Sequence, residues 1–345
     1  MKRKVKTINY GIGSMGSRIA KLALKRGMEI VGAIDRNGEK VGRDLGEVIG
    51  IGKPLGVVVS DDPKAVFSTS EADIVLHSTT SLLTKVRPQI IEAIRSGLNV
   101  ISTCEELAYP YVRHPEIAEE IDVLAKQHGV TILGTGINPG FIMDALVIAL
   151  TAVCQGVDRI QVTRVIDPSR RRLPLQRKAG LGLTLDEFKR KREKGSVGHI
   201  GLLESMAMTA SALGWELDGV EETIEPVVAQ TRLLGGSIDL EEGRLAGIRQ
   251  IGRGCKDGRE VITLDLQIYV GAEGYFDHIV IEGTPRIDLT IKDGLPGDVA
   301  TAAMVVNSIP RVIDAEPGLM TMKDLPPVCA ASFRFSEQIS KSAGG

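Results

Sequence analysis

Aromatic residues are scarce in this chain of 345 residues, where they make up only 3%. A surface that stacks nucleic-acid bases needs aromatic side chains, so no such surface is expected. The formal net charge is only −2, and no strongly basic block dominates the sequence. Nucleic acid is therefore not an expected partner.

Cysteine is also rare, and the four cysteines (Cys104, Cys154, Cys255 and Cys329) form no CxxC pair. This pattern indicates free thiols in a reducing compartment and argues against a cysteine-based zinc site, and we expect no metal. No apolar run reaches the roughly 18 residues that a membrane span needs. The first apolar run is a predicted strand rather than a signal core, so we expect a cytoplasmic protein without a membrane partner.

A glycine-rich turn follows the first apolar run and precedes a helical pattern. It contains Gly11, Gly13 and Gly16, with Ser14 and Met15 between the last two. The first glycine permits a tight turn, the second lets the backbone approach a pyrophosphate, and the third lets the helix pack against the strand. Because free N–H groups at a helix start attract phosphates, these five residues predict a dinucleotide site.

A second predicted strand ends at Asp35, about 20 residues beyond the glycines, where a carboxylate holds the ribose hydroxyls of a dinucleotide. Asp35 favours NAD, because a carboxylate repels a 2′-phosphate. The neighbouring Arg36 could cover the adenine, pair with that phosphate, or be a solvated loop charge. The sequence therefore predicts NAD or NADP as the cofactor.

Strand and helix patterns alternate over the first 140 residues, which predicts an α/β fold with a doubly wound parallel sheet of the Rossmann type. The clearest helices are Lys85–Ser96 and Pro115–Gln127. The expected strands are Val5–Tyr10, Ile30–Asp35, Val57–Ser60, Asp73–Ser78, Asn99–Cys104 and Val130–Gly134.

The pattern then changes to strands with hairpin connections, such as the turn at Lys256-Asp257-Gly258. An apolar helix from Phe141 to Cys154 leads out of the first domain, and helical segments at Thr184–Lys191 and Val197–Leu213 interrupt the strands. These features predict an α+β domain with an open mixed or antiparallel sheet. Its expected strands are Arg159–Ile166, Thr223–Thr231, Leu245–Gly252, Val261–Val270 and His278–Glu282.

A strong helix is predicted over Gly297–Ile313, with Pro310 expected to kink or end it. Its expected apolar stripe is Val299, Ala302, Ala303, Val306 and Ile309. We expect three parts: a dinucleotide-binding domain over residues 1–142, a substrate and dimerisation domain over 143–296, and a C-terminal segment over 297–345 that returns to the first domain.

Ligands of such sheets bind at the carboxyl ends of the strands. Ser78, Thr79 and Thr80 follow the fourth strand, and Asn138 follows the sixth, so we expect all four near the cofactor. Glu105 and Glu106 follow the fifth strand. Two adjacent acids are either solvated loop charges or include an acid/base, which oxidation of an amine needs because a water must be deprotonated.

Other residues are candidates for binding a substrate. Phe141 and Met143 could shape an apolar pocket, or the loop that precedes them could be a simple turn. Five of the nine residues from Arg170 to Lys178 are cations, so Arg171, with Gln176 nearby, could bind a substrate carboxylate; a solvated or interface loop is the alternative. His199 and His278 could line the cavity or be ordinary core residues.

The whole chain resembles the 2,4-diaminopentanoate dehydrogenases and related amine dehydrogenases. The resemblance rests on the glycine motif, Ala33-Ile34-Asp35, Cys104-Glu105-Glu106-Leu107-Ala108-Tyr109-Pro110, Asn138-Pro139-Gly140-Phe141, Arg171-Arg172-Leu173-Pro174-Leu175-Gln176 and Gly297-Asp298-Val299-Ala300-Thr301-Ala302-Ala303.

The resemblance implies a homodimer that converts an amine to a ketone and ammonia with NAD(P), or runs the reverse reductive amination. It also implies a catalytic glutamate in the Glu105-Glu106 pair, and we favour Glu105. The alternative is a reductase of the dihydrodipicolinate type or another NAD(P)-dependent oxidoreductase such as an alcohol dehydrogenase. The His-His-x-x-Lys element of the dihydrodipicolinate reductases is absent here. A non-catalytic NAD-binding sensor is a third hypothesis, which the acid pair disfavours.

Overall fold

The computed structural model describes residues 4–169, 173–235 and 238–330. The chain divides into two compact units. The first unit comprises the chain up to Ile137 and again from Asp298, and the second is Asn138–Gly297. The boundaries expected from the sequence, after residues 142 and 296, lie close to these two points.

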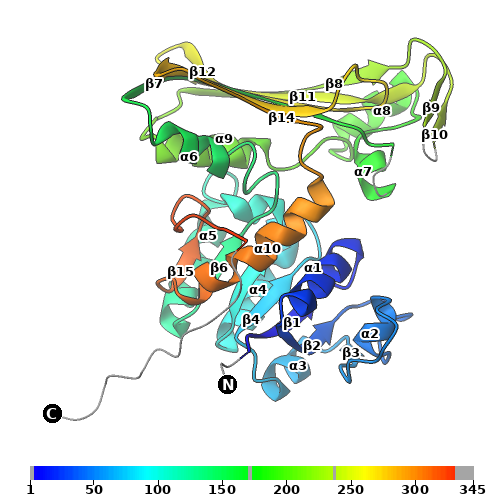
Figure 1. The fold of residues 1–345 in the computed structure, drawn as a ribbon, viewed down its shortest axis with the longest axis vertical. Helices are drawn as coiled ribbons and strands as arrows, with labels where there is room; N and C mark the ends of the chain where they lie inside the picture. The colour runs from blue at the N-terminus through cyan, green and yellow to red at the C-terminus, as the bar shows by residue number, and fades with distance from the viewer. Residues whose placement is uncertain (1–3, 170–172, 236–237, 331–345) are drawn as a thin grey trace. The chain divides into compact units, whose positions relative to one another are not determined.

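The first unit is built on a parallel sheet with seven strands among the described residues, in the order β15-β6-β5-β4-β1-β2-β3 (Figure 1). The six expected strands are all present, which confirms the predicted α/β fold. The strands are β1 (Lys6–Tyr10), β2 (Glu29–Ile34), β3 (Val59–Ser60), β4 (Ile74–His77), β5 (Asn99–Ser102), β6 (Thr131–Gly134) and β15 (Gly318–Met320). The short strand β15 pairs with β6 and was not predicted.

Hydrophobic cores cover both faces of this sheet. Successive side chains of a strand point to opposite faces, and accordingly Ala33 and Ile34 of β2 belong to different cores. The helices that supply the rest of these cores are α1 (Ser14–Lys25), α2 (Leu45–Val48), α3 (Pro63–Thr69), α4 (Leu83–Arg95) and α5 (Pro115–His128). Because these strands run parallel, the loops after β1, β2, β4 and β5 lie at one edge of the sheet.

Helix α10 (Gly297–Ile313) has the predicted bounds, but two details differ from the sequence prediction. Val299 is 59% exposed and is not part of the buried stripe, because it lies in the first turn. The helix also continues past Pro310 to Ile313, since a proline there removes one N–H but the last turn can still form.

The second unit contains a mixed sheet with six strands among its described residues, in the order β14-β13-β7-β12-β11-β8. Only β7 and β12 run parallel among these neighbours. The β11–β12 hairpin turns at Asp257 and Gly258, both with positive φ, as the sequence predicted. The strands are β7 (Gly156–Ile166), β8 (Gly219–Val228), β11 (Leu245–Lys256), β12 (Arg259–Tyr269), β13 (Phe276–Thr284) and β14 (Ile287–Lys292), with β9 (Leu233–Gly235) and β10 (Ile238–Leu240) as a separate pair.

The helices of the second unit are α6 (Ala145–Thr151), α7 (Leu173–Lys178), α8 (Leu185–Glu193) and α9 (Leu202–Ala212), and α6 and α9 lie along one face of the sheet (Figure 1). Two of them are shorter than predicted. Helix α6 begins at Ala145 rather than Phe141, because Asp144 caps it. Helix α9 begins at Leu202 rather than Val197, because Gly198 and Gly201 have φ values of +117° and +126°. None of the helices in the described ranges could cross a membrane.

Candidate functional site

The three glycines of the turn after β1 have different surroundings. Gly11 has a φ of +90°, and a Cβ there would lie 2.5 Å from Ser78 O. A Cβ on Gly16 would lie 1.8 Å from Gly11 O, so α1 could not pack against the turn with any larger residue. A Cβ on Gly13 would meet nothing within 4 Å. Two glycines are therefore required by packing, whereas the third faces open space.

The open space at Gly13 lies at the start of α1. Gly13 and Ser14 are exposed, and Met15 is buried. Among the described residues no side chain caps this helix end, so its first N–H groups have no side-chain acceptor. A helix start with free N–H groups and an uncrowded glycine fits a pyrophosphate. These residues therefore fit the phosphates of a dinucleotide.

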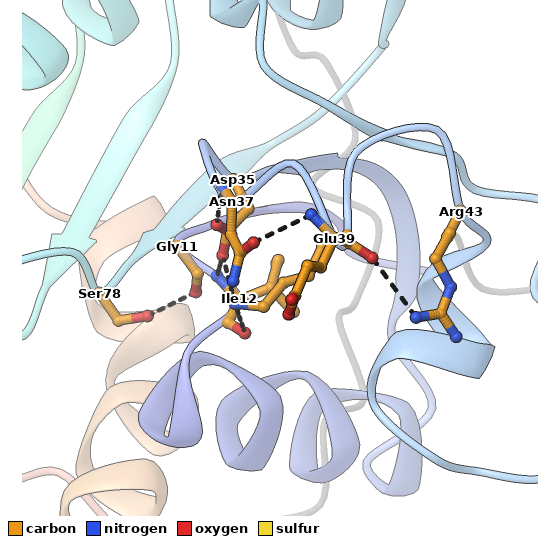
Figure 2. Close-up of polar contacts among 8 residues, drawn as sticks. Gly11, Ile12, Asp35, Asn37, Glu39, Arg43 and Ser78 are labelled. Atoms are coloured by element: carbon orange, nitrogen blue, oxygen red, sulfur yellow. Dashed lines mark hydrogen bonds and ion pairs between the residues drawn. The ribbon is translucent and has the colours of Figure 1, made fainter.

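Asp35 lies directly after β2, and its side chain contacts the glycine turn (Figure 2). Its carboxylate accepts hydrogen bonds from Ile12 N at 2.7 Å, Asn37 N at 2.9 Å and Lys40 Nζ at 3.0 Å. Partial burial acts to raise the pKa of Asp35, but the hydrogen bonds from Asn37, Lys40 and Ile12 outweigh it and lower this pKa. Asp35 is thus ionised, and its neighbour Arg36 is exposed.

The loop after β4 contacts the same turn. Ser78 Oγ donates a 2.9 Å hydrogen bond to Gly11 O (Figure 2). Thr79 and Thr80 are exposed, and Thr79 Oγ1 donates to Gln89 Oε1 at 2.8 Å. The structure therefore brings Gly11, Asp35 and Ser78 together, with Thr79 and Thr80 on the adjoining surface.

His77, the last residue of β4, lies beneath this loop and is 1% exposed. Its Nδ1 is 2.8 Å from Ser102 Oγ, and its Nε2 is 2.8 Å from Gln89 Oε1. Burial lowers the pKa of His77 to about 4, so its ring is neutral near pH 7. This histidine joins the ends of β4 and β5.

Glu105 and Glu106 begin the short 3-10 helix η1 (Glu105–Ala108) after β5. Glu106 is buried, and its Oε2 accepts from Leu83 N at 2.6 Å and lies 3.0 Å from His114 Nε2. Glu105 is half-buried. The two adjacent acids thus have different environments: Glu106 is enclosed by its partners, and Glu105 keeps part of its surface open.

Backbone contacts fix the turn that carries both acids. Cys104 N donates to Ser102 Oγ at 3.1 Å, and Cys104 Sγ lies 3.1 Å from Ser81 O. Glu106 N also donates to Ser81 O, at 3.4 Å. Burial raises the pKa of the Cys104 thiol well above its usual range, so it remains protonated. The acid turn is therefore joined to the loop that follows β4.

In the second unit, His199 and Asn138 form one cluster. His199 Nε2 donates to Asn138 O at 2.9 Å, since a carbonyl can only accept. His199 N donates to Gln250 Oε1 at 2.7 Å, and Gln250 Nε2 returns a 2.8 Å hydrogen bond to His199 O. Burial, aided by the positive charge of Lys178, lowers the pKa of His199 to about 4. This neutral imidazole holds the loop that begins at Asn138.

The same loop is held at its other end by Asp144. Its carboxylate accepts from Gly140 N at 2.8 Å, Ala145 N at 2.6 Å and Ser205 Oγ at 2.7 Å. Burial raises the pKa of Asp144. Phe141 is half-buried, but Met143 is completely buried and has no surface left for a ligand.

The remaining substrate candidates are dispersed. Gln176 Nε2 donates to Pro168 O at 3.2 Å and to Ser169 O at 3.3 Å, so it closes a turn. His278 Nε2 lies 2.8 Å from Asp288 Oδ1 on the neighbouring strand β14. Arg171 lies outside the described residues. Within the described ranges, no three His, Cys, Asp or Glu side chains gather as a metal site would require.

Lys40, His114 and Asp144 contact candidate residues but were not found from the sequence. Lys40 and His114 lie in irregular segments where no helical or strand spacing relates them to their partners. Asp144 offered one signal: an aspartate directly before an apolar helix is a common N-cap.

Comparisons with known proteins cover both units. Residues 5–103 match the family model of the dihydrodipicolinate reductase N-terminus, and residues 141–341 match that of the 2,4-diaminopentanoate dehydrogenase C-terminal domain. The first unit is therefore an NAD(P)-binding domain of the Rossmann type, and the protein is an oxidoreductase.

Full-length relatives narrow this class. A 2,4-diaminopentanoate dehydrogenase of Acetoanaerobium sticklandii is 38% identical, over 99% of this chain and 98% of the relative. An amine dehydrogenase of Streptomyces virginiae is 26% identical, over 93% and 96%. The solved amine dehydrogenase of Mycobacterium smegmatis superposes with a TM-score of 0.85 at 28% identity, over 96% and 98%. The chain belongs to the 2,4-diaminopentanoate dehydrogenase family. This confirms the resemblance that the sequence motifs indicated. The protein is an oxidoreductase that acts on CH–NH2 groups.

Proposed function

We propose that this protein oxidises 2,4-diaminopentanoate or a closely related small amine, with NAD or NADP as the hydride acceptor. The protonated amine, the oxidised cofactor and water give a ketone, ammonium, the reduced cofactor and a proton. The observation that carries this proposal is the acid turn after β5, which lies at the same edge of the sheet as the glycine turn and leaves Glu105 partly open. The relative from Acetoanaerobium sticklandii, named for this substrate, supports it.

Glu105 is the acid/base in this proposal. Loss of hydride converts the amine to an iminium, and a water must then be deprotonated to attack the carbon. A carboxylate at that position accepts the proton of the water and stabilises the cationic iminium. Glu106 is less suited to this role, because its Oε2 is already used by Leu83 N and His114 Nε2.

The cofactor is held by the glycine turn with Ser14 and Met15, by Asp35 and Arg36, and by the loop of Ser78, Thr79 and Thr80. Asn138 is assigned to the cofactor as well.

On the substrate side we assign the apolar contact to Phe141 and the carboxylate contact to Arg171. We also assign His199 to the substrate side, as a neutral group that does not repel a cationic amine, because its pKa is lowered to about 4. Met143 is buried, Gln176 donates to Pro168 O, and His278 contacts Asp288, so we assign none of the three a direct contact with the substrate.

The test is direct turnover. Purified protein is mixed with NAD+ or NADP+ and 2,4-diaminopentanoate, and the absorbance of the reduced cofactor is followed; the reverse reaction uses the corresponding ketone with ammonia. Turnover that depends on ammonia in the reverse direction supports the proposal. Reduction of a ketone without ammonia identifies an alcohol dehydrogenase instead. Tight cofactor binding without turnover of any amine identifies a non-catalytic sensor.

The second unit also mediates a homodimer in this proposal. Light scattering coupled to size-exclusion chromatography should give twice the 37.0 kDa mass of one chain. A monomeric mass at assay concentration contradicts this part alone and leaves the assignment of Glu105 standing.

A further inference from the structure

Lys40 makes two contacts at the glycine turn that the roles assigned so far do not explain. Its Nζ lies 3.0 Å from Asp35 Oδ2 and 2.9 Å from the backbone carbonyl of Ile12. The side chain of Lys40 is 24% exposed and that of Asp35 is 12% exposed. The ammonium is thus held against the carboxylate at the position where a dinucleotide presents its ribose.

An ionised aspartate at this position opposes NADP. The 2′-phosphate carries nearly two negative charges, and the lowered pKa of Asp35 keeps the carboxylate charged. Within the described residues, Lys40 is the one cation hydrogen-bonded to Asp35. Arg36 is exposed, and Arg43 is engaged by Glu39 O at 3.4 Å and by Glu47 at 3.7 Å.

We propose that Lys40 is a determinant of cofactor specificity: it neutralises Asp35 and so allows the site to accept NADP as well as NAD. The backbone donors Ile12 N and Asn37 N orient the carboxylate, while Lys40 balances its charge. With NAD, Asp35 accepts from the ribose hydroxyls. With NADP, the ammonium lies between the carboxylate and the 2′-phosphate. This inference rests on dinucleotide binding by the first unit and not on the oxidation of amines.

The test measures dissociation constants by titration calorimetry for NADP+, NAD+, 2′,5′-ADP and 5′-AMP. Lys40→Met should weaken NADP+ and 2′,5′-ADP by about tenfold or more, because a charge-assisted contact is lost. The same variant should change NAD+ and 5′-AMP by less than about threefold, which also shows that the turn is intact. Lys40→Arg should keep most of the NADP+ affinity, because it keeps the charge.

Lys25→Met is the matched control, since it removes the same side chain from the far end of α1, and it should leave all four affinities unchanged. Asp35→Asn should restore most NADP+ binding to Lys40→Met, because no charge then needs balancing. The proposal is overturned if Lys40→Met weakens all four ligands equally. That result would mean that Lys40 only holds the glycine turn in place through its hydrogen bond to Ile12 O. It is also overturned if NADP+ binding does not change, or if Asp35→Asn restores nothing. None of these outcomes depends on turnover.

Discussion

Glu106 Oε2 lies 3.0 Å from His114 Nε2 and 2.6 Å from Leu83 N, so one buried carboxylate joins the start of α4 to the residue that precedes α5. Such a carboxylate has a structural role, because its Oε2 accepts hydrogen bonds from two groups of the protein. The adjacent Glu105 lies on the same turn but is half-buried rather than buried. Two identical side chains, one residue apart, are therefore expected to respond differently to the same substitution.

Glu105→Gln should lower kcat by about a hundred- to ten-thousand-fold, the usual contribution of a positioned acid/base. Glutamine keeps the shape and can still donate and accept hydrogen bonds, but it cannot accept a proton from water. Affinity for the cofactor should remain near that of the wild type, because the glycine turn and Asp35 lie on other loops. Steady-state kinetics and cofactor titration measure the two quantities separately.

Glu106→Gln is the natural comparison and should be milder on kcat. It should instead lower the free energy of unfolding by roughly 1.5–3 kcal/mol, because a buried charged acceptor is lost. If Glu106→Gln loses turnover while Glu105→Gln keeps it, Glu106 is the acid/base and the mechanism stands. If both variants stay active, the acid/base lies elsewhere, and His199 is the next residue to substitute.

The two glycines Gly13 and Gly16 should separate ligand binding from folding. Gly13→Ala should melt close to the wild type, because its Cβ meets nothing within 4 Å, yet it should weaken NAD+ by at least about tenfold. Gly16→Ala should lower stability by roughly 1–3 kcal/mol or more, because its Cβ would lie 1.8 Å from Gly11 O. Thermal melts and cofactor titration check both. If Gly13→Ala binds NAD+ as tightly as the wild type, the pyrophosphate does not contact this turn.

Asp35→Ala should weaken NAD+ by about ten- to a hundredfold and NADP+ much less. The variant loses an acceptor for the ribose hydroxyls, which costs roughly 1.5–3 kcal/mol for a charged partner, but it also loses the repulsion of a 2′-phosphate. The ratio of the two dissociation constants is the measurement. An unchanged ratio would show that Asp35 does not contact the ribose.

Arg171→Ala should raise KM for a substrate that carries a carboxylate far more than for a simple alkyl amine. Loss of an ion-pair partner in a shielded site costs roughly 1.5–3 kcal/mol, or about ten- to a hundredfold in KM. The simple amine serves as the internal control, since it has no carboxylate to lose. Equal changes for both substrates would give Arg171 a structural or interface role.

Stability should fall as the pH drops below neutrality, in part through His77. The unfolded chain binds a proton near pH 6.5, whereas the folded protein does so only near pH 4, so each step down in this window favours unfolding. Above pH 6.5 the imidazole is neutral in both states, and His77 does not lower the free energy of unfolding. Between pH 6.5 and pH 4 that free energy falls by about 3 kcal/mol because of His77. Urea unfolding of His77→Gln should show a flatter pH dependence.

The sequence predicted the elements that repeat a pattern and missed those that do not. The six buried strands of the parallel sheet were found because each is an apolar run between turn signals. Strand β15 has only three residues, which is too short for any period. The sequence pattern also places Gly198 and Gly201 inside the helix before Leu213, because their positive φ values depend on packing that a one-dimensional pattern does not contain.

The candidate site divides in the same way. The glycine turn and Asp35 have a fixed spacing that reflects the shape of a dinucleotide, so the sequence alone located them. The contacts of Glu106 with His114 and of Lys40 with Asp35 arise where irregular loops happen to meet. Neither contact has a periodic spacing, and each became visible only once the backbone brought the side chains within hydrogen-bond distance.

Strand β15 has a consequence for how the protein is made. The first unit uses residues from both ends of the chain, while the second unit is one continuous segment between them. During synthesis, the nucleotide-binding sheet can form from β1 to β6, but its outer edge at β6 stays open until Leu319 has left the ribosome. The second unit has by then been synthesised in full. An exposed strand edge invites pairing with other chains, so the late addition of β15 also covers the edge of β6 against such pairing.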